Sequence, residues 1–212
     1  MSLCKGGARV VPIARHSGIV GNENLKSPCI FFDRDGIVNA LPDPERYVTS
    51  VQRFFLLPAF VESLRIVTDL GYPAVVVTNQ RGIALGSMSV EDVDEIHARL
   101  GSLLAGEGLA LLDIFVCPHD DDSHPWRKPN PGMLLEAARR HNLNLAQSWM
   151  IGDSPGDILA GRGAGCRTVL VSRSKADVSA DALVDSMEKL PGFLKENVPP
   201  VVLRESGGPQ YG

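Results

Sequence analysis

The sequence lacks several features that would assign it to a particular class of protein. It has no surplus of positive charge, since its 212 residues carry a net charge of −4, and this disfavours a polyanionic partner such as nucleic acid. It has no apolar run of membrane-spanning length, because Glu107 and Asp113 interrupt the longest candidate. No compact apolar run follows Lys5, Arg9 and Arg15, so the start does not resemble a secretory signal. We therefore expect neither a membrane partner nor a nucleic-acid partner.

Cysteine is also scarce. The four cysteines are Cys4, Cys29, Cys117 and Cys166. Their spacing does not resemble a disulfide framework, and Cys29 lies in an apolar run that is typical of a buried strand. Free, buried thiols suit a reducing compartment, so we predict a cytoplasmic protein.

The length favours one domain that is large enough to bury a continuous core. We expect an N-terminal extension over residues 1–27, a single folded domain over residues 28–198 and a C-terminal tail over residues 199–212. A monomer is favoured.

Short apolar runs alternate with helical patterns along the domain. The runs predict strands at residues 28–32, 73–78, 111–116, 149–151, 168–171 and, more briefly, 183–184. Amphipathic spacing and capping residues predict helices over 58–70, from Ser89 onward, over 131–142, from the turn at 152–157 to Gly163 or Gly165, and over 187–197. This order predicts an α/β fold in three layers, with a mainly parallel sheet flanked by helices.

Two carboxylates follow the first predicted strand. Asp33 and Asp35 are separated by one residue, and Gly36 then permits a sharp turn. If the backbone stays extended, both side chains face the same way, and two like charges so close favour a bound cation or a shared proton. An isolated motif of this kind would more often be a simple turn, so its meaning depends on the other strand ends.

Polar side chains follow the other predicted strands or their adjoining loops. They are Thr78 and Asn79, then Arg127 and Lys128, then Asp153 and Asp157. Each pair alone has an ordinary structural explanation. Because the carboxyl ends of parallel strands share one edge of a sheet, all of them together predict a phosphate site with a divalent cation.

These residues resemble the four motifs of the haloacid dehalogenase superfamily of phosphatases. In chain order the motifs are Asp33-Arg34-Asp35-Gly36, Thr78, Lys128, and Gly152-Asp153 with Asp157. A finer resemblance is to the branch of histidinol-phosphate and heptose-bisphosphate phosphatases. It lies in Thr78-Asn79-Gln80-Arg81-Gly82-Ile83-Ala84, Cys117-Pro118-His119 and Arg127-Lys128-Pro129-Asn130-Pro131-Gly132-Met133. It implies a Rossmann-type fold, and residues 37–77 are too few for a large cap domain.

The resemblance implies catalytic roles for four residues. Asp33 would be the nucleophile that forms an aspartyl-phosphate, and Asp35 the general acid and base. Thr78 would hold phosphate oxygens, and Lys128 would balance the charge on the intermediate.

The resemblance also implies a Mg²⁺ cofactor and contacts to substrate. Asp33 and Asp153 would bind the metal through their carboxylates, and Asp35 through its backbone carbonyl. Asn79 and Arg127 would bind the substrate.

The loop after the third predicted strand departs from the branch. Relatives carry a zinc site made of Cys-x-His and a later Cys-x-Cys, whereas the later positions here are His124 and Trp126. Cys117, His119 and His124 leave a structural Zn²⁺ one ligand short of a closed tetrahedron, unless an aspartate at 120–122 or a water completes it. We weigh zinc against a metal-free loop and favour the latter.

The resemblance implies a Mg²⁺-dependent phosphatase of a small phosphorylated sugar, D-glycero-D-manno-heptose 1,7-bisphosphate. A histidinol-phosphate phosphatase is the nearest alternative. A polynucleotide 3'-phosphatase would need a basic groove, which the net charge disfavours. A non-catalytic phosphosugar-binding protein would need neither Asp33 nor Asp35 in this arrangement.

Overall fold

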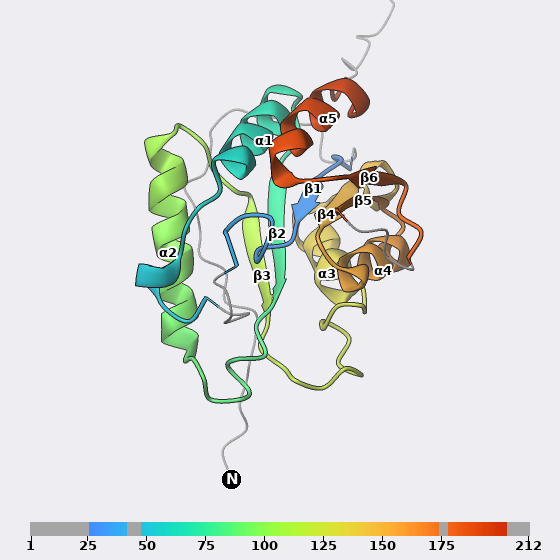
Figure 1. Cartoon of the computed structure of the whole chain (residues 1–212). Helices are drawn as coiled ribbons and strands as arrows, with labels where there is room; N and C mark the ends of the chain where they lie inside the picture. The colour runs from blue at the N-terminus through green and yellow to red at the C-terminus, as the bar shows by residue number, and fades with distance from the viewer. Residues whose placement is uncertain (1–25, 42–47, 174–177, 203–212) are drawn as a thin grey trace, which may run out of the picture.

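A parallel sheet of six strands forms the centre of the molecule (Figure 1). The computed structural model describes residues 26–41, 48–173 and 178–202. The strands are β1 (Ile30–Phe32), β2 (Ala74–Asn79), β3 (Asp113–Cys117), β4 (Trp149–Gly152), β5 (Arg167–Val171) and β6 (Ala182–Val184). Their order is β3-β2-β1-β4-β5-β6, and every neighbouring pair is parallel. The central position of β1 places its carboxyl end between those of β2 and β4.

Helices cover both faces of this sheet. They are α1 (Pro58–Asp69), α2 (Val90–Gly106), α3 (Gly132–His141), α4 (Pro155–Ala164) and α5 (Leu190–Asn197). Figure 1 shows α1, α2 and α5 on one side and α3 and α4 on the other. The described ranges also contain short 3₁₀ helices at Val51–Arg53, Leu145–Gln147 and Met187–Lys189. The predicted three-layer α/β class is confirmed.

Alternation along β1 explains the two layers of helices. Ile30 and Phe32 face the core beneath α1, α2 and α5, whereas Phe31 faces the core beneath α3 and α4. All three side chains are fully buried, and the ring of Phe32 meets that of Phe60 edge to face at 5.2 Å. A strand that is apolar on both faces is typical of a covered parallel sheet.

Capping side chains set the helix boundaries that the sequence predicts. Ser89 and Asp92 form a capping box at the start of α2, and Ser154 and Asp157 form another at the start of α4. At its end, α3 stops at Asn142 in the left-handed conformation. These boundaries follow the sequence because each depends on a local hydrogen bond or backbone preference.

The predicted division into extension, domain and tail stays a prediction, because residues 1–25 and 203–212 lie outside the described residues. The start of the predicted tail does pack on the domain, since the amide of Val201 donates to the carbonyl of Leu70 at 2.8 Å. Within the ranges that the structure describes, none of the helices combines the length and apolar character that a bilayer span requires.

Candidate active site

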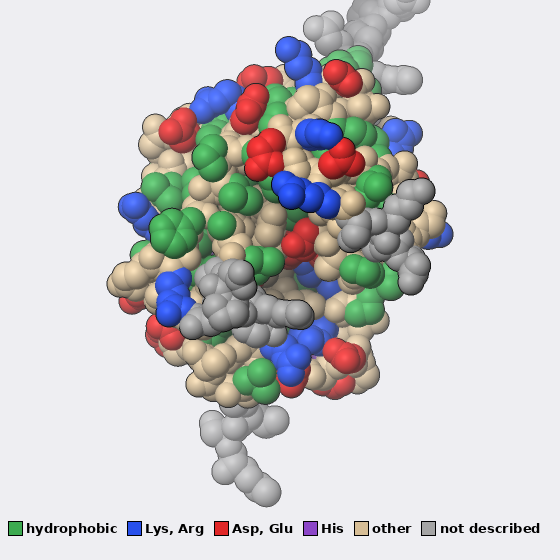
Figure 2. Space-filling model, viewed as in Figure 1, with side chains coloured by type: hydrophobic (Ala, Val, Ile, Leu, Met, Phe, Trp, Pro, Cys, Tyr) green, Lys and Arg blue, Asp and Glu red, His purple; other side chains and the backbone are tan. Residues whose placement is uncertain are grey.

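The predicted motifs meet at one edge of the sheet because three neighbouring strands end there. Phe32 of β1 is level with Val76 of β2 and Ile151 of β4. Asp33 leaves β1 immediately after Phe32, and its amide donates to the carbonyl of Ile151 at 2.9 Å. Thr78 lies two residues beyond Val76. In the space-filling view, acidic and basic side chains border an indentation near the centre of the face of the molecule that is shown (Figure 2).

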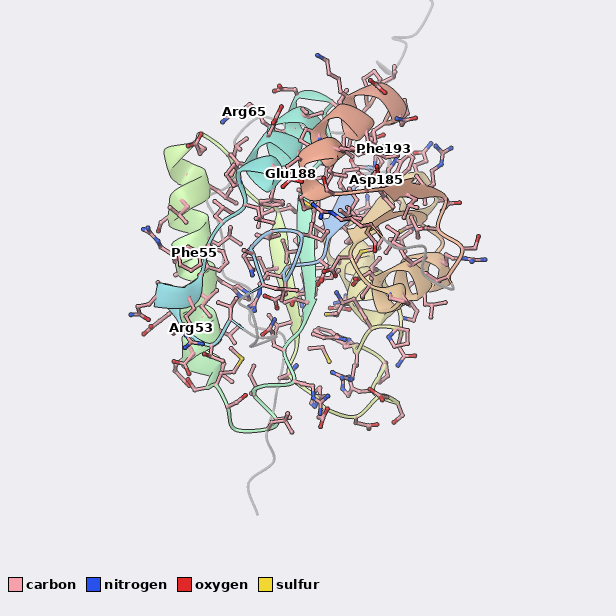
Figure 3. All side chains as sticks on the ribbon, in the orientation of Figure 1. Arg53, Phe55, Arg65, Asp185, Glu188 and Phe193 are labelled. Carbon is pink, nitrogen blue, oxygen red and sulfur yellow. The ribbon has the colours of Figure 1, made fainter. Side chains whose placement is uncertain are left out.

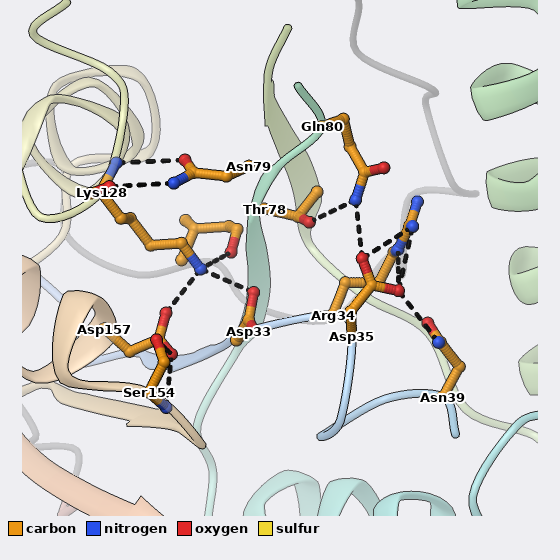
Figure 4. Close-up of polar contacts among 11 residues, drawn as sticks. Asp33, Arg34, Asp35, Asn39, Thr78, Asn79, Gln80, Lys128, Ser154 and Asp157 are labelled. Atoms are coloured by element: carbon orange, nitrogen blue, oxygen red, sulfur yellow. Dashed lines mark hydrogen bonds and ion pairs between the residues drawn. The ribbon is translucent and has the colours of Figure 1, made fainter. Parts of the chain in front are cut away.

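Lys128 brings two of the motif carboxylates together (Figure 4). Its ammonium lies 2.6 Å from Oδ1 of Asp33, 2.6 Å from Oδ1 of Asp157 and 2.9 Å from the carbonyl oxygen of Val77. All of these side chains are buried. Three acceptors around one ammonium satisfy its three donors, so Lys128 is fixed in the centre of the site.

The electrostatics of this cluster favour a further cation. Burial, and next the charge of Asp157, raises the pKa of Asp33 to about 8, although Lys128 opposes the shift. Burial and Asp157 also raise the pKa of Asp153 to about 6. Burial works against the charged form of Lys128, yet Asp157 and Asp33 raise the pKa of this amine above its usual value. The carboxylates outnumber the ammonium, so a divalent cation would relieve their repulsion.

Asp33, Asp153 and Asp157 fit a metal ion by geometry as well. Each offers a carboxylate oxygen, and these oxygens lie within 4.8 Å of one another. Gly36 leaves room for the carboxylate of Asp153, because a Cβ at residue 36 would lie 2.1 Å from Oδ2 of Asp153. Carboxylate oxygens are the ligands that Mg²⁺ prefers. Asp157 joins this group although it is not among the predicted metal ligands.

The side chain of Asp35 has other hydrogen-bond partners than that of Asp33. β1 ends at Phe32, so the extended backbone on which the shared direction depends does not continue. Oδ1 of Asp35 accepts from Arg34 and from Asn39 at 3.0 Å, and Oδ2 accepts from Gln80 at 2.8 Å. Gln80 also donates to the hydroxyl of Thr78 at 2.8 Å. The predicted metal contact of Asp35 through its backbone carbonyl stays a prediction.

The two predicted substrate-binding residues have partners within the protein. The side-chain amide of Asn79 donates to the carbonyl of Lys128 at 2.9 Å and accepts from its amide at 3.1 Å. Nε of Arg127 donates to Asp122 at 2.7 Å, and its Nη1 donates to the carbonyl of His119 at 3.1 Å. Asn79 therefore holds the backbone of Lys128, while Arg127 braces the loop that carries it.

The loop considered for zinc has no converging ligand set. The rings of His119 and His124 stack with centroids 3.9 Å apart, and Nδ1 of His124 accepts from the amide of Trp126 at 3.2 Å. Among the residues that the structure describes, the only cluster in which three or more His, Cys, Asp or Glu ligand atoms lie within 4.8 Å of one another is Asp33, Asp153 and Asp157, which contains neither histidine.

A separate cavity of about 420 Å³ lies between β6 and α5. Asp185, Glu188 and Phe193, which line it, are labelled in Figure 3. None of the predicted site residues lines this cavity. Two residues that do line it, Asp185 and Lys189, already form an ion pair with each other. We therefore place the chemistry at the strand ends.

Three comparisons identify known proteins that are similar to this chain. A family model described as "HAD-hyrolase-like" matches residues 125–190. D-glycero-beta-D-manno-heptose-1,7-bisphosphate 7-phosphatase of Pseudomonas aeruginosa is 35% identical over 147 residues, which are 69% of this chain and 82% of that protein. A HAD-like phosphatase from Mesorhizobium loti has a TM-score of 0.73 at 31% identity, over 92% of this chain and 96% of its own. D,D-heptose 1,7-bisphosphate phosphatase from B. bronchiseptica, complexed with magnesium and phosphate, has a TM-score of 0.72 at 30% identity, over 80% of this chain and 98% of its own.

The fold and the strand-end site, together with these similarities, define a phosphatase of the phosphoric monoester hydrolase class. The chain belongs to the haloacid dehalogenase superfamily of phosphatases, in the branch that contains the heptose-bisphosphate phosphatases.

Proposed function

We propose that the protein is a Mg²⁺-dependent phosphatase that removes a phosphoryl group from D-glycero-D-manno-heptose 1,7-bisphosphate. The observation that carries this proposal is the meeting of Asp33, Lys128 and Asp153 at one edge of the sheet. The relative from P. aeruginosa is named for this substrate, which supports the sugar assignment.

In the proposed reaction, a carboxylate oxygen of Asp33 attacks phosphorus in line with the sugar oxygen. The bond from phosphorus to the sugar oxygen breaks, and Asp35 gives its proton to that oxygen. Asp35 then takes a proton from water, which attacks the phosphoryl group on Asp33 and releases inorganic phosphate. One residue thus serves both steps, which requires its carboxyl group to lie beside the leaving oxygen.

The surrounding residues offset the negative charge of this reaction. The ammonium of Lys128 lies beside the nucleophile, so it is placed to balance charge on the phosphoryl oxygens. Thr78 offers a hydroxyl at the same edge. Mg²⁺ would be held by Asp33, Asp153 and the backbone carbonyl of Asp35, and when bound it would lower the repulsion between the carboxylates and the phosphate.

A panel of phosphorylated substrates tests this proposal. We expect release of one phosphate from the 1,7-bisphosphate, in one of its anomers, with a higher kcat/KM than from histidinol phosphate or a 3'-phosphorylated oligonucleotide. EDTA should abolish the release, and added Mg²⁺ should restore it. A higher kcat/KM for histidinol phosphate would overturn the sugar assignment, while full activity in EDTA would overturn the metal dependence. Elemental analysis of the same sample would report whether zinc is present.

A further inference from the structure

Arg34, between the two motif aspartates, is the largest side chain that the structure buries completely. A buried guanidinium destabilises a protein unless charged or polar partners compensate it. Nη2 of Arg34 lies 3.0 Å from Oδ1 and 2.9 Å from Oδ2 of Asp35, and Nε lies 3.2 Å from Oδ1. Such a forked contact fixes the plane of the carboxylate as well as its position.

Two amides complete this arrangement around Asp35 (Figure 4). Asn39 donates to Oδ1 and Gln80 donates to Oδ2. Both oxygens therefore accept from more than one side chain, while 15% of the Asp35 side chain stays exposed. Three side chains therefore hold the carboxylate, and Arg34 is the only one of them that contacts both of its oxygens.

His97 of α2 supports Arg34 from the opposite side. Its Nε2 lies 3.5 Å from Nη1 of Arg34, and the ring is 2% exposed. A guanidinium can only donate, so a hydrogen bond at this contact requires Nε2 to accept, as it does in the neutral imidazole that carries its proton on Nδ1. Burial, and next the charge of Arg34, lowers the pKa of His97 to about 3, in agreement with a neutral ring.

We propose that Arg34 and His97 are positioning residues for Asp35: Arg34 orients the carboxyl group of Asp35 toward the leaving oxygen, and His97 holds Arg34 in place. This inference rests on the proposed function, because it takes Asp35 as the group that gives its proton to the sugar oxygen. In that step the bond between phosphorus and the sugar oxygen breaks, the bond to Asp33 forms, and the proton of Asp35 moves to the departing oxygen.

Two substrates with different leaving groups distinguish a positioning role of Arg34 and His97 from a merely structural one. A sugar alkoxide must be protonated as it leaves, whereas 4-nitrophenolate is stable without a proton. A variant in which the carboxyl group of Asp35 is misplaced should therefore lose far more kcat/KM for the sugar phosphate than for 4-nitrophenyl phosphate. The ratio kcat/KM is the correct quantity, because it reports the steps up to phosphoryl transfer and excludes the later hydrolysis that both substrates share.

The matched variants are His97→Phe, which removes the acceptor, and His97→Gln, which keeps one. We expect His97→Phe to lower kcat/KM for the sugar phosphate by ~10- to 100-fold and for 4-nitrophenyl phosphate by less than ~3-fold. His97→Gln should recover most of the loss. Ile96→Val, a buried neighbour on the same helix, controls for disturbed packing and should leave both substrates unchanged.

Equal losses for the two substrates, or no loss in His97→Phe, would overturn the inference. Arg34→Lys keeps the buried charge but not the fork, so it provides a second test of the same selectivity if His97→Phe does not fold. Asp35→Asn is measured in parallel. If Asp35→Asn also lacks the selective loss, the role of Asp35 in the proposed function fails. If Asp35→Asn shows the selective loss and the Arg34 and His97 variants do not, only the positioning inference fails.

Discussion

The ammonium of Lys128 lies 2.6 Å from Oδ1 of Asp33, and both side chains are almost completely buried. The same ammonium contacts Asp157, so a single cation stands between two buried carboxylates. We therefore expect the cluster to matter for folding as well as for the proposed chemistry.

Lys128→Met should destabilise the protein strongly. Removing the cation leaves Asp33 and Asp157 buried without a counter-charge, and breaking a buried ion pair in this way costs about 3–5 kcal/mol. Urea unfolding measures the loss. Lys189→Met removes a cation from an exposed ion pair with Asp185 and should change the free energy of unfolding by less than ~1 kcal/mol. Equal effects of the two substitutions would contradict the importance of the buried cluster.

Gly36→Ala should weaken metal binding. Gly36 has φ +91°, and an added Cβ would meet Oδ2 of Asp153 at 2.1 Å, so the carboxylate must move. Gly86→Ala is the matched control, because Gly86 has φ +68° but open space at the Cβ position. Both substitutions strain the backbone by about 1 kcal/mol, yet only Gly36→Ala should raise the Mg²⁺ concentration needed for half-maximal activity. The same Mg²⁺ requirement in both variants would contradict the placement of Asp153 as a ligand.

His97 should make the protein less stable in acid. Its pKa is about 3 in the folded protein, below the ordinary value near ~6.5. Between these values the unfolded chain binds a proton that the folded protein does not, so stability rises with pH in this window and is lost as pH falls through it. The slope is at most ~1.4 kcal/mol per pH unit.

Urea unfolding at several pH values below ~6.5 tests this linkage. His97→Gln has no titrating ring, so its stability should fall less steeply with acid than that of the wild type. Ile96→Val retains His97 and should keep the wild-type slope. Identical slopes in wild type and His97→Gln would contradict the lowered pKa, because His97 would then take up its proton equally in the folded and unfolded states.

The sequence is sufficient to predict the fold class and the meeting of Asp33, Thr78 and Asp153. Apolar, β-branched runs mark the strands, and the carboxyl ends of neighbouring parallel strands share one edge. Lys128 lies on a loop, and its place beside Asp33 follows from the family resemblance rather than from periodicity.

The side-chain partners at the site could not be predicted, because they depend on turns and tertiary packing. Asp35 faces Arg34, Asn39 and Gln80 only because β1 ends at Phe32 and the chain then turns. No sequence pattern shows that Arg34 is buried.

Asn79 illustrates a second limit of sequence patterns. A polar residue at a strand end can face either a ligand or the backbone, and Asn79 faces the backbone of Lys128. The contact of Asp157 with Lys128 joins residues 29 positions apart and depends likewise on how α4 packs.

Phosphate release by Asp33→Asn tests the central claim most directly. The amide keeps the shape of the side chain but cannot act as the nucleophile. With the heptose bisphosphate and saturating Mg²⁺, and with the wild-type fold confirmed by circular dichroism, we expect kcat to fall by about 10³-fold or more. Turnover within about tenfold of the wild type would contradict the account, because the reaction would then proceed without an aspartyl-phosphate on Asp33.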